Sequence, residues 1–374
     1  MTAPRILVKM PNWVGDCVMA TPAINLLRNA LPHATIDLLV RPGIAGILAT
    51  NPHVSSVIPL HEKKLTPADL KRLRQPRYDA TALFTNSLGS AWFAFKLRSR
   101  RRIGFNREGR GLLLTHRLPY RPLEWTTPTP QPVSRRSITG IPEKGHPRHM
   151  VEYYIEIARA TLRAIDPALT DVTPGIDFKL VLPLHRAAEA RISEMLRAAG
   201  LHNKTLIGIN PGAAHGPAKR WSPERLGHLV DGLQRDDWAF VSTAAPNESH
   251  LNDRVQAATS APIHRLGEST SLLELPALIS RLSCLVTNDS GAMHIAAARQ
   301  VPTITIFGPT DWASTHPWSA PAHRVSHSVP CSPCFLEECP LPDHPCMDGV
   351  EAYDVSRELL RALGVSGRFK KVTP

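Results

Sequence analysis

The chain has no long uninterrupted apolar segment. Its longest uncharged stretch, residues 80–95, is broken by threonine, serine and asparagine, whereas a bilayer-spanning helix needs about 20 predominantly apolar residues. Near the N-terminus, Lys9 and Asp16 interrupt the apolar residues before the hydrophobic region of a signal peptide is complete. These absences argue against a transmembrane span and an export signal, so we expect a cytoplasmic protein.

Two common nucleotide-binding signatures are also missing. No GxxxxGK[ST] loop is present, and no GxGxxG follows the first predicted strand of either half of the chain. Both absences weaken the hypotheses of a P-loop NTPase and of a nicotinamide-dependent dehydrogenase.

Acidic residues are scarcer than basic ones, 32 against 44, which gives a net charge of +12. A positive field favours partners rich in phosphate or carboxylate, such as nucleic acid, anionic lipid or a sugar nucleotide. Five of the seven residues in 96–102 are cationic; such a run is a solvated surface, or it holds an anionic lipid or a phosphorylated glycan near an acceptor site. No aromatic stacking pattern or nucleic-acid-binding motif accompanies the charge, so we expect no nucleic acid partner.

A length of 374 residues predicts two or three domains. In the first half, predicted strands and helices alternate, and a helix resumes at His149. The predicted strands are 5–9, 35–40, 54–60, 78–84 and 102–105, and the predicted helices 19–31, 67–74 and 87–98. This alternation predicts a parallel sheet covered by helices on both faces.

The second half repeats the pattern after a predicted linker at 166–175. Its predicted strands are 206–210, 239–243, 285–288 and 303–307, and its predicted helices 223–233, 248–257, 272–282 and 291–299. Two α/β halves predict an interdomain cleft, with ligands bound beyond the carboxyl ends of the strands. Between the halves, the proline-rich segment 119–148 is expected to be an irregular loop.

The turn at 11–16, Pro-Asn-Trp-Val-Gly-Asp, joins the first strand to the first helix. Gly15 allows a ligand to approach the backbone closely. Asp16 is either the helix N-cap or a carboxylate facing the cleft. If its carboxylate faces the cleft, Asp16 is a candidate general base for a substrate hydroxyl.

The second candidate segment is 210–221, which follows the first strand of the second half. Its glycine-containing loop ends in Lys219 and Arg220 before a helix. Backbone N–H groups and these cations suit a diphosphate, although the two cations could simply solvate the start of the helix.

The third candidate segment, 287–294, passes directly from a strand into a helix. The amides around Ser290 and Gly291 are expected at the helix N-terminus, where the dipole favours an anion. Asp289 could instead bind a sugar hydroxyl. His294 lies four residues after Ser290 and therefore on the same face, although a lone helical histidine is more often structural.

A fourth group is the C-x2-C-x4-C-x6-C cluster of Cys331, Cys334, Cys339 and Cys346. Four thiolates could hold a structural zinc ion, but the last pair lacks zinc-ribbon spacing. Free thiols or a conditional disulfide are the alternatives, and the spacing matches neither ferredoxin pattern of an iron–sulfur cluster. Cys17 and Cys284 lie among apolar residues and are expected in the core.

Together, these segments resemble the ADP-heptose:lipopolysaccharide heptosyltransferases, glycosyltransferase family 9, and most closely their heptosyltransferase II branch. The resemblance runs in order along nearly the whole chain. Its motifs are PNWVGD at 11–16, RRIGFNREGRGLLLT at 101–115, HMVEYY at 149–154, NPGAAHGPAKRW at 210–221, TNDSGAMH at 287–294 and FGPT at 307–310.

The resemblance implies an α/β fold of GT-B type, with two Rossmann-like domains facing across a cleft. We accordingly expect an acceptor-side domain at 1–175, a nucleotide-sugar-binding domain at 176–350, and a C-terminal helix in 351–374 that packs back toward the first domain. The implied reaction is an inverting, metal-independent transfer of heptose from ADP-L-glycero-D-manno-heptose to the inner-core heptose of lipopolysaccharide, with heptosyl-Kdo2-lipid A as acceptor. No cofactor is implied, and the enzyme would lie at the inner face of the inner membrane, against its anionic surface.

By position, Asp16 matches the family's catalytic base and Lys219 its diphosphate-binding lysine. The acidic residue that contacts the ribose in relatives aligns near Pro246, and the nearest carboxylate here is Glu248. The donor side is therefore predicted to comprise Gly212, Lys219, Arg220, Glu248, Asp289, Ser290, Gly291 and His294. The acceptor side is predicted to comprise Asn12, Trp13, Arg101 and Arg102.

Two other functions compete with this prediction. One keeps the family and changes the step, to heptosyltransferase I or to transfer of a different sugar. The other is a non-catalytic binding protein that uses the basic surface and the cysteine cluster. The second leaves the ordered set of motifs unexplained.

Overall fold

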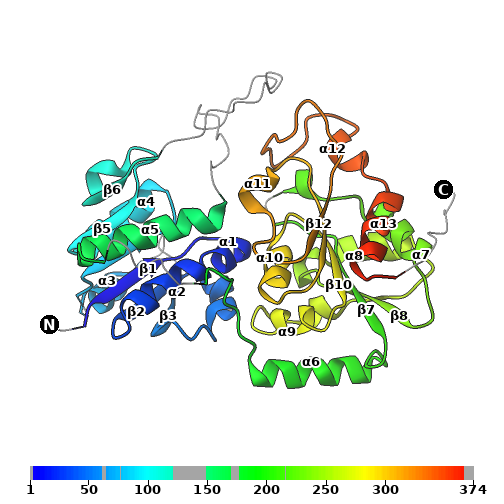
Figure 1. The fold of residues 1–374 in the computed structure, drawn as a ribbon, viewed down its shortest axis with the longest axis horizontal. Coiled ribbons are helices and arrows are strands. Elements are labelled where there is room, and N and C mark those ends of the chain that lie inside the picture. Colours follow the sequence, from blue (N-terminus) through cyan, green and yellow to red (C-terminus); the bar gives the residue numbers. More distant parts are fainter. Residues whose placement is uncertain are drawn as a thin grey trace. The chain divides into compact units, whose positions relative to one another are not determined.

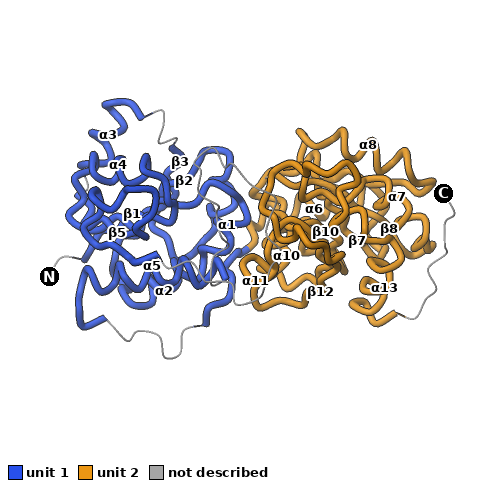
Figure 2. Tube along the Cα trace, turned by 90° about the horizontal axis from the view of Figure 1, so that it is seen from above, with its two compact units in different colours: residues 1–122, 147–183 blue, residues 123–146, 184–374 orange. Residues whose placement is uncertain are grey.

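The computed structural model describes residues 3–60, 65–75, 77–120, 149–169, 177–214 and 216–365. These residues form two compact units (Figure 2): unit 1 comprises those up to 120 together with 149–183, and unit 2 those from 184 onward. The domain boundary expected after residue 175 lies outside the described residues, as does nearly all of the predicted proline-rich loop.

Unit 1 contains a six-stranded, wholly parallel sheet (Figure 1) in the order β3-β2-β1-β4-β5-β6. The strands are β1 (Arg5–Lys9), β2 (Thr35–Val40), β3 (Ser56–Pro59), β4 (Ala80–Leu83), β5 (Arg101–Phe105) and β6 (His116–Leu118). The helices are α1 (Val14–Met19), α2 (Thr21–Ala30), α3 (Pro67–Arg74), α4 (Leu88–Lys96) and α5 (Met150–Ile165), with 3-10 helices η1 (Pro42–Leu48) and η3 (Arg110–Leu113).

Unit 2 has a second six-stranded parallel sheet, in the order β12-β11-β10-β7-β8-β9. The strands are β7 (Thr205–Asn210), β8 (Trp238–Ser242), β9 (Ile263–His264), β10 (Cys284–Asn288), β11 (Thr303–Ile306) and β12 (Ala322–Val325). The helices are α6 (Arg186–Ala198), α7 (Pro223–Gly232), α8 (Ser249–Ala257), α9 (Leu275–Ile279), α10 (Gly291–Ala298), α11 (Trp312–Thr315), α12 (Pro345–Asp348) and α13 (Ala352–Ala362). The 3-10 helices are η4 (Pro217–Lys219), η5 (Pro246–Glu248) and η6 (Leu266–Ser269).

The predicted helix 19–31 is wrong in one respect, because two helices, α1 and α2, meet at Ala20. Pro22 lies in the first turn of α2. Proline lacks a backbone N–H and its ring clashes with the carbonyl four residues earlier, so it can begin a helix but cannot continue one. The hydroxyl of Thr21 donates to the carbonyl oxygen of Val18 at 2.7 Å across the junction.

Helix α13 packs within unit 2, against α7 and β12. Val355, Leu359 and Leu360 are buried in the core of that unit. The apolar face of α13 is therefore covered within unit 2. Packing of this helix toward the first domain stays a prediction. No helix in the described part of the chain has the length and apolar character needed to cross a membrane.

Both sheets follow the strand order of a Rossmann fold, in which the direction of winding reverses between two central strands. The reversal lies between β1 and β4 in unit 1 and between β7 and β10 in unit 2. Ligands of such sheets bind at the carboxyl ends of these strands. Asp16 follows β1, and the segments with Lys219 and Asp289 follow β7 and β10, so the fold places these motifs at the two reversal points.

Candidate active site

Two asparagines join the loops that follow β7 and β10. The Asn288 amide donates to the carbonyl oxygens of Pro211 and Gly212, each at 3.2 Å, and its Oδ1 accepts from the Trp221 N–H at 3.0 Å. The Asn210 amide donates in return to the Ser290 hydroxyl oxygen at 3.0 Å. Both asparagines are buried, so these bonds hold the two loops in one fixed arrangement.

Lys219 and Asp289 form an ion pair between these loops. The Lys219 ammonium lies 2.7 Å from Oδ2 of Asp289, and the two side chains are 14% and 6% exposed. Burial by itself raises the pKa of the Asp289 carboxyl, but the charge and hydrogen bond of Lys219, with a smaller contribution from His294, lower it overall. The carboxylate is therefore ionised at neutral pH and holds the lysine at the carboxyl edge of the sheet.

His294 lies on α10, and its side chain is 3% exposed. Burial, followed by the positive charge of Lys219 and by His316, lowers its pKa to about 4 despite the opposing effect of Asp289, so the ring is neutral at pH 7. Its Nδ1 is buried and has no hydrogen-bond partner among the described residues, and the same is true of Nε of Arg220. Such orphaned polar atoms are costly, and a polar ligand at this edge would satisfy them.

Gly212 and Glu248 lie against each other. A Cβ atom added at Gly212 would collide with the Glu248 carboxylate, so only glycine leaves room for that group. Glu248 ends η5, just after β8, and its Oε2 accepts from the Ala245 N–H at 3.3 Å. The structure thus brings this carboxylate to the loop that carries Lys219.

Helix α10 begins directly after Ser290, its N-cap residue, whose side chain makes no capping hydrogen bond. The Ser290 hydroxyl is instead within 3.0 Å of the Thr287 hydroxyl. Gly291 opens the first turn, at the positive end of the helix dipole. All the residues predicted for the donor side belong to unit 2, and they follow β7, β8 and β10.

The segment containing the four clustered cysteines packs on the Lys219 loop. The carbonyl oxygen of Glu337 accepts from the Ala218 N–H at 3.0 Å, and Nε2 of His344 lies 2.8 Å from the Ala218 carbonyl oxygen. Gly216, at φ 150°, would collide with the backbone of Glu337 if it carried a side chain. The cysteine segment is therefore a support for the lysine loop.

None of the six cysteines, all of which lie in the described part of the chain, forms a disulfide bond, and Cys17 and Cys284 are buried in the core as predicted. Burial, followed by the neighbouring thiols of the cluster, raises the pKa of Cys346 to about 12. The described residues hold no group of three or more His, Cys, Asp or Glu side chains placed as metal ligands. The four clustered thiols are not identified as such a group, so the zinc ion considered from their spacing stays a prediction.

In unit 1 the helix N-cap is Trp13, and Asp16 lies in the first turn of α1. The cap alternative for Asp16 is therefore wrong. Oδ1 of Asp16 accepts a hydrogen bond from the Tyr154 hydroxyl at 2.9 Å. Burial, followed by the Asp16 charge, raises the pKa of Tyr154 well above its ordinary range, so this phenol remains a donor. Sequence reasoning missed Tyr154 as a site residue, although the HMVEYY motif contains it.

A second missed group lies at the carboxyl ends of β4 and β5. Arg110 is fully buried; its guanidinium donates to the carbonyl oxygen of Phe105 at 2.8 Å and to Oδ1 of Asn86 at 3.1 Å. Burial lowers its pKa to about 10. The Tyr153 hydroxyl donates to the same Asn86 oxygen at 2.5 Å. The GFNREGRG segment of the family motif supplies this arginine, but nothing in the sequence indicates that it is buried.

The structure separates the residues predicted for the acceptor side. Asn12 and Trp13 lie in the turn before Asp16, the first half-buried and the second exposed. Arg101 pairs with Ala80, which is level with Ile6 at the start of β1. Arg101 and Arg102 therefore lie near the amino edge of the sheet, whereas Asp16 follows the carboxyl edge, and they are not brought to it.

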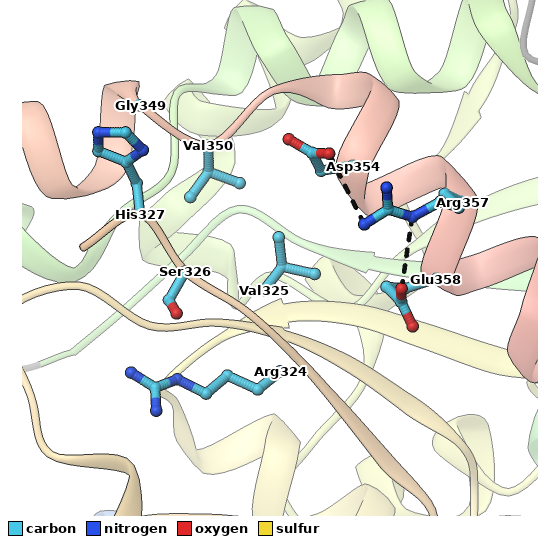
Figure 3. A pocket seen from close by; sticks show the side chains of 9 residues that line it. All are labelled: Arg324, Val325, Ser326, His327, Gly349, Val350, Asp354, Arg357 and Glu358. Atoms are coloured by element: carbon cyan, nitrogen blue, oxygen red, sulfur yellow. Dashed lines mark ion pairs between the residues drawn. The ribbon is translucent and has the colours of Figure 1, made fainter.

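A separate cavity of about 410 Å³ lies in unit 2 between β12 and α13 (Figure 3). It is lined by Arg324, Val325, Ser326, His327, Gly349, Val350, Asp354, Arg357 and Glu358. Arg357 approaches Asp354 at 3.8 Å and Glu358 at 3.5 Å. Because these charges face one another and the lining includes no predicted site residue, the cavity is not part of the candidate active site.

Comparison with known proteins agrees with this picture. The model of the family described as "Glycosyltransferase family 9 (heptosyltransferase)" matches residues 134–344. Lipopolysaccharide heptosyltransferase 2 of Salmonella typhimurium is 28% identical over 332 residues, which cover 86% of this chain and 87% of the relative.

Solved structures show the same similarity. The structure of E. coli ADP-heptose lps heptosyltransferase II has a TM-score of 0.74 and 25% identity, covering 96% of this chain and 98% of that one. The family 9 glycosyltransferase of Veillonella parvula has a TM-score of 0.77 and 21% identity, covering 97% and 98%. These matches confirm the resemblance predicted from the motifs and the α/β, GT-B fold class.

Proposed function

The chain belongs to glycosyltransferase family 9, the heptosyltransferases, and from this premise we propose that it transfers L-glycero-D-manno-heptose from ADP-heptose to the inner-core heptose of lipopolysaccharide. This is the heptosyltransferase II type of reaction, and the Salmonella and E. coli relatives carry that name. The acceptor would be heptosyl-Kdo2-lipid A.

The observation that carries the proposal is the polar edge of unit 2. There the ion pair of Lys219 with Asp289 acts electrostatically on His294, whose Nδ1 has no hydrogen-bond partner in the part of the chain that the structure describes. A nucleotide diphosphate offers anionic oxygens to the lysine and to the start of α10, and acceptor or donor atoms to the unpaired nitrogens. Glu248, which follows β8 and lies against Gly212 of the Lys219 loop, would accept a hydrogen bond from a ribose hydroxyl.

In the proposed reaction, Asp16 takes the proton of the acceptor hydroxyl as that oxygen attacks the anomeric carbon of the donor. The new carbon–oxygen bond forms on the face opposite the leaving group, and the old carbon–oxygen bond breaks with its electron pair going to ADP. The anomeric configuration inverts. Lys219 and the first N–H groups of α10 stabilise the charge that develops on the diphosphate, so we propose that no metal ion is needed.

Unit 1 would contribute the acceptor side through Asp16 and the adjoining Asn12 and Trp13. A role for Arg101 and Arg102 in holding the acceptor stays a prediction, because they lie near the other edge of the sheet. Since the acceptor is lipid-linked, we propose that the enzyme works at the inner face of the inner membrane, as a peripheral protein on its anionic surface.

The test is transfer from ADP-heptose to two purified acceptors, Kdo2-lipid A and its monoheptosylated form, with and without a chelator. Product on the monoheptosylated acceptor alone, undiminished by the chelator, supports the proposal. Product on the unheptosylated acceptor would assign the chain to the first heptose step. Absence of product on both would direct the search to other sugar donors.

The same assay tests the catalytic base. Asp16→Asn should lower turnover by about 10²–10⁴-fold, the usual contribution of a general base, and leave the circular dichroism spectrum unchanged. Asp236→Asn, at an exposed aspartate of unit 2, is the matched control. A fully active Asp16→Asn enzyme would show that another group accepts the proton.

A further inference from the structure

Helix α4 of unit 1 exposes apolar side chains in a continuous stripe. Leu88, Trp92 and Phe95 are spaced four and three residues apart, so they share one face of the helix. They are 52%, 47% and 46% exposed. The opposite face, with Ala91 and Ala94, is buried against the unit. A helix that is apolar all round is normally enclosed on every side, which leaves the outer face of α4 in need of an explanation.

The neighbouring 3-10 helix η3 extends this surface. It packs beside α4, and its Leu112 is 87% exposed. Arg110, the first residue of η3, anchors this helix through its buried hydrogen bonds to Phe105 and Asn86. We call the surface formed by Leu88, Trp92, Phe95 and Leu112 the α4 face; Figure 1 marks α4.

Cations lie at the C-terminal end of the α4 face. The Lys96 ammonium lies 5.4 Å from the centre of the Trp92 ring, and the Arg102 guanidinium 5.6 Å from that of Phe95. Arg98 and Arg100, just beyond the helix, are exposed. Residues 84–118 contain eight lysines and arginines, of which all but the buried Arg110 are at least partly exposed, and a single acidic residue, Glu108. The surface thus combines aromatic and aliphatic side chains with a positive rim at the C-terminal end of the helix.

We propose that the α4 face is a membrane-docking surface that inserts its four apolar side chains into the interface of an anionic bilayer. Tryptophan and phenylalanine are suited to the boundary between headgroups and acyl chains, and the cations around them would meet anionic headgroups. A second copy of the chain is a poorer occupant, since a two-fold interface would set the same positive rim against itself.

The position of the face fits the lipid-linked acceptor, so this inference rests on the proposed function. Helix α4 begins directly after β4, with Ser87 as its N-cap. Strand β4 is the parallel neighbour of β1, which leads to Asp16. The N-terminal end of the α4 face therefore lies toward the sheet edge that carries Asp16, and docking there would present the headgroup of a membrane-embedded acceptor to unit 1.

The experiment is flotation of the full chain with vesicles of phosphatidylethanolamine and phosphatidylglycerol, compared with phosphatidylcholine vesicles. The double variant Trp92→Ser/Phe95→Ser should bind the anionic vesicles at least about tenfold more weakly, since each large apolar side chain is worth that much or more when buried. Arg98→Gln/Arg100→Gln should weaken binding about fivefold per charge and reduce its salt dependence. Leu341→Ser, at an exposed leucine of unit 2, is the control and should bind as the parent does.

Two results would overturn the inference. One is vesicle binding that Trp92→Ser/Phe95→Ser leaves unchanged. The other is self-association in analytical ultracentrifugation that disappears in this variant, which would identify a second copy as the occupant. Transfer to a delipidated, soluble acceptor separates the two proposals. On that acceptor, Trp92→Ser/Phe95→Ser should retain full activity. Failure of the parent chain on every acceptor would count against the proposed function and leave the vesicle result intact.

Discussion

The ammonium group of Lys219 lies 2.7 Å from Oδ2 of Asp289, and this pair joins the loops after β7 and β10 at the reversal point of the unit 2 sheet. Both partners are largely withdrawn from water, so each compensates a charge that would otherwise be costly to bury. The pair therefore has two roles to separate: it holds the loops together, and it offers a positive charge to a diphosphate.

Lys219→Met should lower the free energy of unfolding by about 3–5 kcal/mol, because it leaves the Asp289 carboxylate buried without a partner. Lys219→Met/Asp289→Asn should recover much of that loss while still failing to bind ADP tightly. Urea denaturation measures the first effect and titration calorimetry with ADP the second. ADP binding that returns together with stability would mean that the lysine acts only on the fold.

Tyr154→Phe should reduce kcat by about tenfold with little change in KM for either substrate. The Tyr154 hydroxyl donates to Asp16, and a hydrogen bond to a charged group contributes about 1.5–3 kcal/mol; its loss removes one contact that orients the carboxylate toward the acceptor hydroxyl. Steady-state kinetics on the heptosylated acceptor measures the changes in kcat and in KM separately. Tyr78→Phe, which removes a phenol bonded to Asp37 instead, controls for loss of a buried hydroxyl. An equal loss in both variants would point to stability rather than positioning.

Stability should fall as the pH falls from about 6.5 toward 4 because of His294. Burial holds its pKa at about 4 in the folded chain, against an ordinary value of 6.5. Between these values the unfolded state binds a proton that the folded state does not, so unfolding becomes easier at lower pH. The effect of this one residue is about 1.4 kcal/mol between pH 7.5 and 5.5.

Urea denaturation at these two pH values, on the parent and on His294→Gln, measures that contribution. The variant should lose less stability than the parent over the interval, whatever its absolute stability. Equal pH dependence in the two proteins would show that folding does not lower the pKa of His294.

Gly212→Ala should weaken ADP binding nearly as much as Glu248→Gln does. The added methyl group meets only the carboxylate end of the Glu248 side chain, which can swing aside without moving the backbone, so the fold should survive. If both changes act through this carboxylate, their effects should not add. The double variant should then bind ADP as tightly as the single variant that has the lower affinity for ADP. Gly43→Ala, with open space around its Cβ position, controls for the general effect of adding a methyl group to glycine. Additive losses would show that Gly212 contributes independently of Glu248.

Local sequence was sufficient for much of the secondary structure. Strands β1 and β2 and helix α3 have the predicted bounds. Helix α6, in contrast, was not predicted. The short strand β6 was also missed, since its three residues are too few to establish a period.

Local sequence also located the motifs at the ends of their strands, because a strand, a turn with glycine and a helix start are neighbours along the chain. It could not find the hydrogen bond between Tyr154 and Asp16, which spans 138 residues. Nor could it show that Arg110 is buried, or that Glu337 and His344 support Ala218. Arginine and histidine are usually exposed, and only the packed sheet and its loops create the enclosed surroundings that these residues occupy.

From sequence alone come the α/β alternation, the family motifs and the positive charge, all of which depend on the identity and order of residues. Strand order, the meeting of Lys219 with Asp289, the separation of Arg101 from Asp16 and the outward stripe of α4 arise from the tertiary structure. They depend on which strands pair and which helix face is covered, and those outcomes follow from the burial of the whole chain rather than from any one segment.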